Sequence, residues 1–341
     1  MTGRIAFSLW KWQGDYYSRD IPGGVEVAPH TGSIYTVNAD GSEPYCVFSQ
    51  PGRDANLPTF SPDGRWLTFQ SDLAGHHQIY RCRPDGSELV NLTAGDALGA
   101  EWREAYGFAL SGDGRKMVYT IHNGVMGRAV LANADGSVPR LAAPHLGYTY
   151  MAALDTSGER VVFSGPADGY RLKLLTVADE RVTDLTPHHP NSYVPRFTPN
   201  GEWIVFFRRD GEVYRVRAEG GPVERLTKGR DYVRFRLSDQ DAHGSSDEPA
   251  ISPDGTRIAH IGVYDGTPNV YVMNLDGGQP RQLTFRKEPC GRVRWSQDGA
   301  WLAFVSFVGP YTQLFVVSAD GGEPYQVTHF DAAVYMLAWQ P

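Results

Sequence analysis

The sequence predicts an all-β protein, a seven-bladed β-propeller built from four-stranded antiparallel blades. Three observations favour this fold: a turn motif that recurs at blade-length intervals, apolar residues that alternate along the segments between turns, and a composition rich in turn residues. Gly (38) and Pro (23) together make up about 18% of the 341 residues, which is typical of a turn-rich chain.

The recurring motif is an apolar residue followed by Ser-Pro-Asp-Gly or a close variant, as in Phe60-Ser61-Pro62-Asp63-Gly64. The glycine of the motif occurs six times, at Gly64, Gly114, Gly158, Gly201, Gly255 and Gly299. Successive glycines are 50, 44, 43, 54 and 44 residues apart. This period suits a four-stranded propeller blade.

Each repeat contains four short strands, and the last complete repeat shows them most clearly, at residues 293–295, 301–305, 313–317 and 325–328. The motif joins the first strand to the second, and a tight Asp-Gly turn such as Asp320-Gly321 joins the third to the fourth. Asp accepts backbone hydrogen bonds in such turns, and Gly adopts positive φ without steric cost. Six complete units of this kind run from Pro58 to about His329.

The two ends of the chain supply the seventh blade, from residues 3–50 plus 334–341. Residues 3–7 match a second strand, and 34–37 and 45–48 match the third and fourth. The missing first strand is predicted within 335–341, where Trp339-Gln340 takes the place of Trp295-Ser296. Pairing of the last strand with the first closes the ring, because an open ring would leave a row of unpaired backbone groups. We expect a single domain over 1–341.

The repeat resembles that of TolB-type (PD40, WD40-like) propellers. The resemblance rests on the Phe-Ser-Pro-Asp-Gly unit, the Ile79-Tyr80 strand that follows it, and a Leu-Thr ending as in Leu92-Thr93. It covers nearly the whole chain. It implies the fold rather than a function, because these residues build turns and core.

The charge balance, the apolar stretches and the cysteines of the sequence indicate which partners and which compartment to expect. With 32 Lys+Arg and 39 Asp+Glu, the formal net charge is −7, which argues against a nucleic-acid binder. No apolar stretch approaches the ~20 residues of a membrane span, and the N-terminus lacks a signal-peptide pattern. Three cysteines without CxxC spacing favour free thiols in a reducing compartment. We expect a cytoplasmic protein without membrane contact.

Strand order separates two rims of the ring. The short turns between the first and second strands and between the third and fourth lie on one, here called the turn rim. The other connections, between the second and third strands and from one blade to the next, lie on the opposite loop rim. Nine of ten histidines are predicted there: His30, His76, His77, His122, His145, His188, His189, His243 and His329, with His260 inside a strand. Histidine is polar and is seldom found inside strand cores, which explains part of this bias. An anion, metal or proton-transfer site would explain the rest.

Two loops on this rim are longer than a blade needs, about 8–33 and about 228–247. The first carries Trp10, Trp12 and Tyr16, which either stack on a ligand or pack inside the mouth. In the second, the alternation from Tyr232 to Arg236 places Arg234 and Arg236 on one side if extended. That pair either clamps a carboxylate or phosphate, or forms an exposed basic edge.

The segment from Asp239 to Gly244 begins like a calcium loop, but Ala250 stands where a bidentate Glu is required. We therefore reject an EF-hand-like site and leave open a looser Asp/His site for a divalent ion. The sequence also lacks a Gly-x-Ser-x-Gly elbow, a phosphate-binding Gly loop and a His-Glu-x-x-His helix.

A weaker resemblance is to oligogalacturonate lyases, which are seven-bladed propellers with related repeats. Gln240-x-x-His243 resembles part of their metal-ligand pattern, although position 245 is Ser where a second His is expected. The resemblance implies β-elimination from a uronate-containing saccharide. It assigns His189, Gln240 and His243 to a divalent cation (manganese or calcium), Arg234 and Arg236 to an anion clamp, and His122 and His188 as candidate bases. Ligand contacts at the mouth are expected from Trp10, Trp12, Tyr16, Tyr193, Tyr232, His145 and His329.

The alternative is a non-catalytic, TolB-like propeller that binds a ligand or a protein partner across the mouth. Partner faces favour Tyr, Trp and Arg, whereas a metal enzyme needs converging His and carboxylates. The loop rim carries both kinds of residue, so a small anionic or carbohydrate ligand and a protein partner both remain open.

Overall fold

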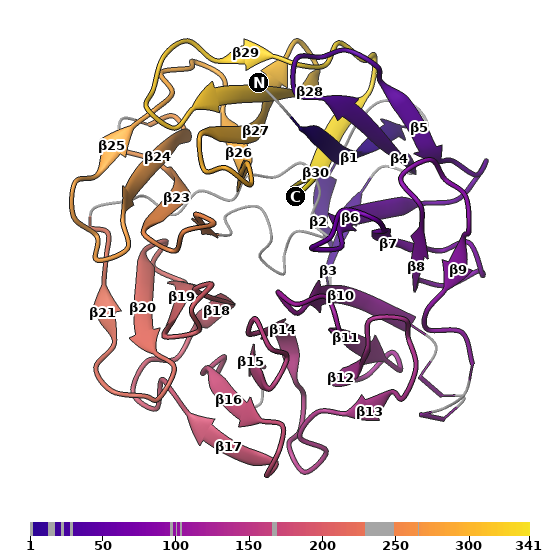
Figure 1. Cartoon of the computed structure of the whole chain (residues 1–341), viewed down its shortest axis with the longest axis vertical. Coiled ribbons are helices and arrows are strands. Elements are labelled where there is room, and N and C mark those ends of the chain that lie inside the picture. Colours follow the sequence, from indigo (N-terminus) through magenta and orange to yellow (C-terminus); the bar gives the residue numbers. More distant parts are fainter. Residues whose placement is uncertain are drawn as a thin grey trace.

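The computed structural model describes residues 3–341 apart from 13–17, 22–23, 28–29, 96–97, 100, 103, 166–168, 229–248 and 265. The regular elements of these described residues are all strands, and seven four-stranded antiparallel sheets form a closed ring around a central axis (Figure 1). The predicted fold class is confirmed. In the described part of the chain, no helix has the length and apolar character to span a membrane.

The blades follow one another around the ring, each with its first strand innermost. Blade 1 contains β30 (Ala333–Trp339), β1 (Arg4–Trp12), β4 (His30–Asn38) and β5 (Tyr45–Phe48). Blade 2 contains β6 (Ala55–Phe60), β7 (Leu67–Ser71), β8 (Gln78–Cys82) and β9 (Val90–Asn91). Blade 3 contains β10 (Glu104–Leu110), β11 (Lys116–His122), β12 (Gly127–Asn133) and β13 (Arg140–Leu141).

The other four blades repeat this order. Blade 4 contains β14 (Tyr150–Leu154), β15 (Arg160–Ser164), β16 (Lys173–Thr176) and β17 (Arg181–Asp184). Blade 5 contains β18 (Ser192–Phe197), β19 (Trp203–Arg208), β20 (Val213–Arg217) and β21 (Glu224–Arg225). Blade 6 contains β22 (Ala250–Ile251), β23 (Arg257–Gly262), β24 (Asn269–Asn274) and β25 (Arg281–Gln282). Blade 7 contains β26 (Cys290–Trp295), β27 (Trp301–Val308), β28 (Tyr311–Ser318) and β29 (Tyr325–Gln326).

The ring closes as the sequence predicts. The C-terminal strand β30 pairs antiparallel with β1, with Ile5 opposite Trp339 and Phe7 opposite Leu337. The predicted loop over 8–33 is shorter than expected, because β1 continues to Trp12 and β4 already begins at His30. Between them, β2 (Ser18–Ile21) and β3 (Gly24–Val27) form an additional two-stranded hairpin.

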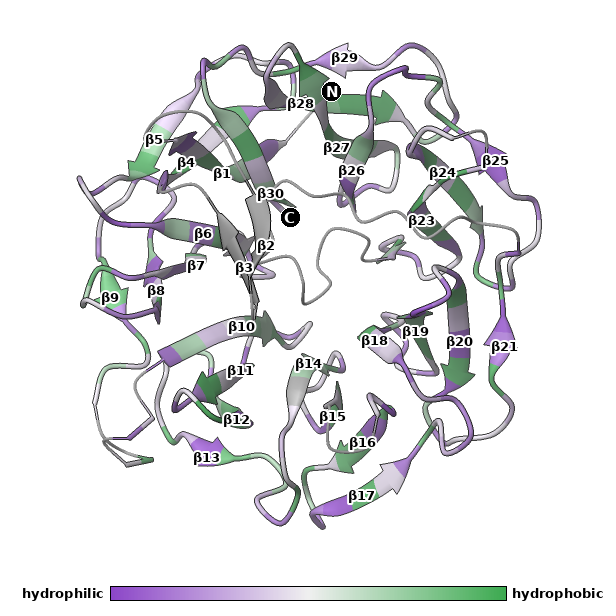
Figure 2. Ribbon diagram, turned by 180° about the vertical axis from the view of Figure 1, so that it is seen from behind, coloured by the Kyte–Doolittle hydropathy of each residue, from purple (hydrophilic) through white to green (hydrophobic). Residues whose placement is uncertain are grey.

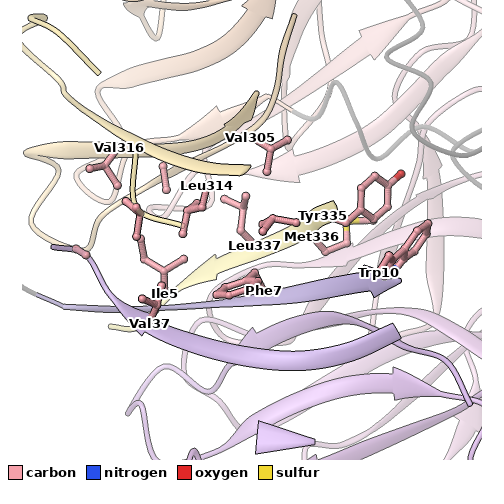
Figure 3. Packing of buried hydrophobic residues seen from close by; sticks show 14 residues of the cluster. Ile5, Phe7, Trp10, Val37, Val305, Leu314, Val316, Tyr335, Met336 and Leu337 are labelled. Atoms are coloured by element: carbon pink, nitrogen blue, oxygen red, sulfur yellow. The ribbon is translucent and has the colours of Figure 1, made fainter. Parts of the chain in front are cut away.

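The hydrophobic core lies between neighbouring blades rather than at the axis. Ile5 and Phe7 pack with Leu314 of blade 7, whereas Ala6, one residue along β1, packs with Phe69 of blade 2 (Figure 3). Successive residues of a strand point to opposite faces of its sheet, so the period-two pattern serves both neighbours. Figure 2 shows the consequence: apolar colour follows strands such as β24 and β27, and polar colour follows outer strands such as β25.

The turn motif is held by a repeated hydrogen-bond network. In blade 7 the Ser296 hydroxyl donates to Asp298 Oδ1 (2.5 Å) and accepts from the Trp301 N–H (2.9 Å), while the Ala300 N–H donates to the same Asp298 oxygen (2.9 Å). The hydrogen bond from Ser296 lowers the pKa of Asp298. Gly299 has φ +67°, the left-handed region that favours glycine.

The Leu-Thr ending also has a structural role. In blade 6 the Thr284 hydroxyl accepts the Val270 N–H (2.9 Å) and donates to Asn269 Oδ1 (2.8 Å), all within the buried interior. In blade 7 the Thr328 hydroxyl likewise accepts the Leu314 N–H and donates to Gln313 Oε1. The threonine therefore satisfies backbone and side-chain polar groups where the short fourth strand ends.

Candidate functional site

The loop rim gathers the imidazoles. The eight predicted rim histidines inside the described residues all lie in its connections or at the strand ends that border them: His30, His76, His77, His122, His145, His188, His189 and His329. His260 lies in β23, where it is buried and stacks on Tyr271 with ring centroids 5.7 Å apart. His243 lies outside the described residues.

Four side chains on this rim form the imidazole–carboxylate cluster: His30, Asp54, His77 and Glu104. Asp54 lies between two imidazoles, with His30 Nε2 3.7 Å from Oδ1 and His77 Nε2 3.9 Å from Oδ2. His77 Nδ1 is 3.6 Å from Glu104 Oε2, and the His77 backbone N–H donates to the same oxygen (2.9 Å). The cluster joins blades 1, 2 and 3.

Local structure fixes the position of these groups. Asp54 comes directly before β6, and its backbone N–H donates to Asp72 Oδ1 (2.7 Å) just beyond β7. Asn56 donates to Asp54 Oδ2 (3.0 Å). His77 and Glu104 stand where β8 and β10 begin, so each side chain is anchored at the end of a strand rather than on a long loop.

The electrostatics of the cluster favour a charged His77. Burial opposes protonation, but the pull of Asp54, with contributions from Glu104 and Asp72, outweighs it and raises the pKa of His77 above its ordinary value. A histidine in such a setting can act as a proton donor near neutral pH.

An aromatic stack extends the cluster toward blade 7. The Trp10 ring lies between those of His30 and Tyr335, with centroids 4.2 and 4.3 Å away. The guanidinium of Arg292, on β26, lies 4.3 Å above the Tyr335 ring and donates to its hydroxyl. Trp10 is only 2% exposed, so both of its faces contact protein and the packing alternative fits it. Trp12 is half-buried, with its edge toward His30.

Two further arginines lie on innermost strands, Arg196 on β18 and Arg294 on β26. Loss of water around the guanidinium lowers the pKa of Arg196 to about 9, and the charge of Arg294 adds to this effect. Burial likewise lowers the pKa of Arg294 to about 10. Blade 6 lies between their blades, and each arginine is on the strand of its blade that lines the centre of the ring. Both remain charged at neutral pH.

Comparisons with known proteins agree with this architecture. The family model described as PD40, TolB beta propeller domain, matches residues 234–341. A curated Protein TolB homolog from Chlorobium luteolum is 26% identical over 220 residues, which is 64% of this chain and 36% of the homolog. The crystal structure of TolB from Acinetobacter baumannii has a TM-score of 0.57 at 16% identity, covering 99% of this chain and 67% of that one. The chain is therefore a β-propeller that resembles TolB in sequence and in fold.

A second likeness is stronger in shape and weaker in sequence. An oligogalacturonate lyase in complex with manganese has a TM-score of 0.66 at 14% identity, over 97% of this chain and 87% of that one. At such identity the likeness shows the fold alone. The TolB-like propeller also spans about a third of the length of the TolB homolog it matches.

Several predicted site residues lie on the loop rim of this TolB-like propeller. His122 ends β11 between Tyr106 and Tyr148, with ring centroids 6.1 and 6.2 Å away. Its Nδ1 accepts the Gly124 N–H (2.9 Å), which leaves the proton of the neutral ring on Nε2. The neutral ring can therefore donate at Nε2 but not accept there, which suits a hydrogen-bond donor better than a base.

The other predicted site residues that the structure describes are spread around the loop rim. His188 and His145 are exposed in connections between blades. His189 is half-buried, and burial, with the charges of Arg208 and His188, lowers its pKa. Tyr193 donates to Asn191 Oδ1 (3.2 Å) and lies against Tyr170, with ring centroids 4.8 Å apart. His329 is exposed, and its Nδ1 is 3.0 Å from Gln326 Nε2.

Six predicted residues lie outside the described residues: Tyr16, Tyr232, Arg234, Arg236, Gln240 and His243. Of the predicted metal set, only His189 is described. Among the residues that have a description, no three His, Cys, Asp or Glu side chains are arranged to hold a metal ion.

Sequence reasoning missed Asp54, Glu104, Arg196 and Arg294. A signal for the arginines was present. The residue before the aromatic or apolar position of the motif is small in the other blades (Thr59, Ala109, Ala153, Ala250 and Ala338), and only blades 5 and 7 place Arg there. Asp54 and Glu104 carry no such signal, because only the ring geometry brings them to His77.

Proposed function

We propose that the loop rim binds an anionic, uronate-containing saccharide and cleaves it by β-elimination. The observation that carries the proposal is His77 fixed between Asp54 and Glu104 at that rim. The likeness in fold to an oligogalacturonate lyase supports it, as does the presence of positive charge at the centre of the ring.

The anion would be met by Arg196 and Arg294. Two guanidiniums held in partly desolvated surroundings attract a carboxylate more strongly than surface charges do. Neutralising the uronate carboxylate makes the adjacent ring proton more acidic, which is the requirement of this elimination.

Proton transfer to the leaving group would use His77, whose pKa is raised. A neutral base on the same rim would take the proton next to the carboxylate. The electron pair then forms the ring double bond as the bond to the glycosidic oxygen breaks. His77, held protonated by Asp54 and Glu104, would give its proton to that leaving oxygen.

A divalent cation, manganese or calcium, is part of the same proposal. His189, Gln240 and His243 would hold it if the resemblance to the lyases extends to their metal ligands, and it would supply charge neutralisation at the sugar carboxylate. Metal analysis of protein purified without a His tag, combined with the assay below, tests this part.

The test is an assay for the unsaturated product, which absorbs in the ultraviolet, with oligogalacturonates as substrate and with manganese or calcium added in parallel. We expect activity in the unmodified protein and a loss of at least a hundredfold in His77→Gln, in line with removal of a general acid. The neighbouring rim residue His76, which is outside the imidazole–carboxylate cluster, provides the matched control, His76→Gln, which should retain activity. If no product forms from any polyuronate with or without added metal, the lyase proposal is wrong.

A second candidate function is the docking of a protein partner on the same rim. Three large apolar side chains are exposed on neighbouring blades: Phe285 (79%), Tyr264 (44%) and Val308 (41%). Tyr264 and Phe285 follow the loop-rim ends of β23 and β25, and Val308 is the last residue of β27 at the same rim. If docking is the function, Phe285→Ser should abolish partner binding and leave any saccharide cleavage unchanged.

A cytoplasmic location remains part of the proposal. Cys46, Cys82 and Cys290 are all free, which suits a reducing compartment. Fractionation of the source cells, with detection of the protein in the soluble cytoplasmic fraction, tests it.

A further inference from the structure

A cavity of about 400 Å³ lies on the turn rim between blades 2 and 3, on the other rim from the imidazole–carboxylate cluster. Blade 2 contributes Trp66, which precedes β7, and Arg81 of β8. Blade 3 contributes the turn from β10 to β11 and the turn that follows β12, which includes Ala134. We call this cavity the blade 2–3 pocket.

Arg81 lines this pocket with an incomplete set of partners. Its guanidinium carbon lies 4.4 Å from the centre of the Trp66 ring. Among the described residues, no carboxylate forms an ion pair with this guanidinium, and its Nε is buried without a hydrogen-bond partner. A buried donor without an acceptor costs free energy, and more so when it is charged. The Arg81 guanidinium is therefore held by an aromatic ring but is not neutralised.

Blade 5 contains the same arrangement with the partners in place. The Arg215 guanidinium lies 4.0 Å from the centre of the Trp203 ring, and its Nε donates to Glu224 Oε2 (2.7 Å). Nη2 of the same guanidinium is 2.6 Å from that carboxylate oxygen. Nη1 donates to the Leu275 carbonyl in the turn of the next blade (3.0 Å). Blade 5 thus neutralises the stacked arginine with a carboxylate and ties it to blade 6.

Blade 2 lacks both of these partners. The residue opposite Arg81 in the sheet is Val90, whereas Glu224 lies opposite Arg215 in blade 5. In the next blade Ala134 occupies the turn position that corresponds to Leu275, and it lines the blade 2–3 pocket instead of accepting a hydrogen bond from the arginine. The comparison of the two blades shows which group the arginine of blade 2 is missing, namely a carboxylate.

Other charges of the pocket limit what a ligand can carry besides that carboxylate. Asp63, Asp113 and Asp135 line the pocket, together with the cations Arg81 and Arg115. The carboxylates outnumber the cations, so a ligand with two or more negative charges is repelled, whereas a single carboxylate can be met by Arg81. A phosphate, a sulfate or a polyuronate therefore fits this pocket poorly.

We propose that the blade 2–3 pocket binds a small acid with a single carboxylate. The bound carboxylate neutralises the Arg81 guanidinium as Glu224 neutralises that of Arg215, and stacking on Trp66 keeps the guanidinium in position. The pocket lies on the turn rim and disfavours polyuronates, so this binding is independent of the reaction proposed above.

Fluorine NMR of protein labelled with fluorotryptophan reads the pocket directly, because Trp66 lies in its wall. Trp66→Phe and Trp203→Phe assign the two resonances. Titration with propionate at constant ionic strength should shift the Trp66 resonance and leave that of Trp203 unchanged, since the arginine on Trp203 already has Glu224. Succinate and inorganic phosphate should bind roughly tenfold more weakly than propionate, because their additional charge meets the aspartates.

A pair of matched variants tests the role of Arg81. Val90→Glu restores the pair found in blade 5 and should weaken propionate binding roughly tenfold, because the new carboxylate neutralises Arg81 from within the chain. Leu89→Glu adds the same charge one position earlier, outside the pair with Arg81, and should leave binding unchanged. Val90 and Leu89 are 45% and 42% exposed, so both variants are expected to fold.

A capped peptide with one central Glu distinguishes two sources of the carboxylate. Binding of propionate without the peptide identifies a free acid, and binding of both identifies an acidic side chain of a partner as a further source. The proposal is overturned if propionate leaves the Trp66 resonance unmoved or shifts that of Trp203 equally. It is also overturned if Val90→Glu binds as well as the unmodified protein, or if succinate or phosphate binds as tightly as propionate.

Discussion

At the scale of single residues, the protonation of His77 depends on its neighbours more than on its burial. Asp54, Glu104 and Asp72 face the imidazole, and His30 shares Asp54 with it. Arg53 also contacts Asp72 (4.0 Å). The pull of the carboxylates raises the pKa of His77, so the charged form is the one that the fold stabilises.

This shift predicts how stability changes with pH. The folded pKa of His77 exceeds its ordinary value of 6.5. Its stabilising contribution is therefore fully present below about pH 6.5 and is lost as the pH rises through the folded pKa. We expect the free energy of unfolding to fall less between pH 6 and pH 9 in His77→Gln than in the unmodified protein, as measured by urea unfolding. Identical slopes in the two proteins would show that His77 is not stabilised in its charged form.

The threonine that ends each blade makes a second residue-scale prediction. Thr284 is fully buried and satisfies both the Val270 N–H and Asn269 Oδ1. Thr284→Val keeps the shape but leaves the Val270 N–H unpaired and removes one of the hydrogen bonds to Asn269 Oδ1, which still accepts the Arg286 N–H. The loss should cost about 1–3 kcal/mol of unfolding free energy. Chemical denaturation measures this. The exposed Thr256→Val serves as the control, and an equal loss in the two variants would contradict the assigned role of Thr284.

At the scale of elements, the C-terminal strand β30 closes the ring. Val334, Tyr335 and Leu337 of this strand are buried between blades 7 and 1, where Figure 3 shows Leu337 near Leu314 and Phe7. Leu337→Ala should therefore lower the free energy of unfolding by about 2–5 kcal/mol.

The control for this prediction is Leu89→Ala, since Leu89 is 42% exposed in the connection before β9. Urea unfolding should show a change below about 0.5 kcal/mol there. If Leu337→Ala is as mild as its control, the last strand is dispensable and the ring is held by the other blades.

The elements of the fold were predictable to different degrees. The Ser-Pro-Asp-Gly turns, the Asp-Gly turns and the pairing of Trp339 with Ile5 all follow from local patterns and from the need to pair strand edges. The lengths of β1 and β4 did not follow, because their outer ends at Trp12 and His30 belong to a hairpin rather than to the alternating blade core.

The candidate site was predictable only as a rim. Strand order alone places the histidine-bearing connections on one side of the ring. It does not show that Asp54 and Glu104 meet His77, since these residues are separated by 23 and 27 positions in the sequence and come together through the curvature of three blades. For Trp10 the sequence leaves ligand contact and packing open, and its burial between His30 and Tyr335 favours packing.

At the scale of the whole molecule, the two rims have different tasks. The turn rim repeats one hydrogen-bond network in Ser61-Asp63, Ser111-Asp113, Ser252-Asp254 and Ser296-Asp298. On the loop rim the repeated network is that of the threonine that ends the fourth strand, as in Thr284 and Thr328, and the connections beyond it differ from blade to blade. This rim holds the imidazole–carboxylate cluster. Variable connections on a rigid ring are the usual place for binding and catalysis.

Hydrogen–deuterium exchange with and without trigalacturonate tests this division most directly. The account predicts slower exchange in loop-rim segments around residues 72–78 and 144–149, with no change in turn-rim segments such as 61–66 and 296–301. Protection confined to the turn rim, or no protection anywhere at saturating ligand, would contradict it.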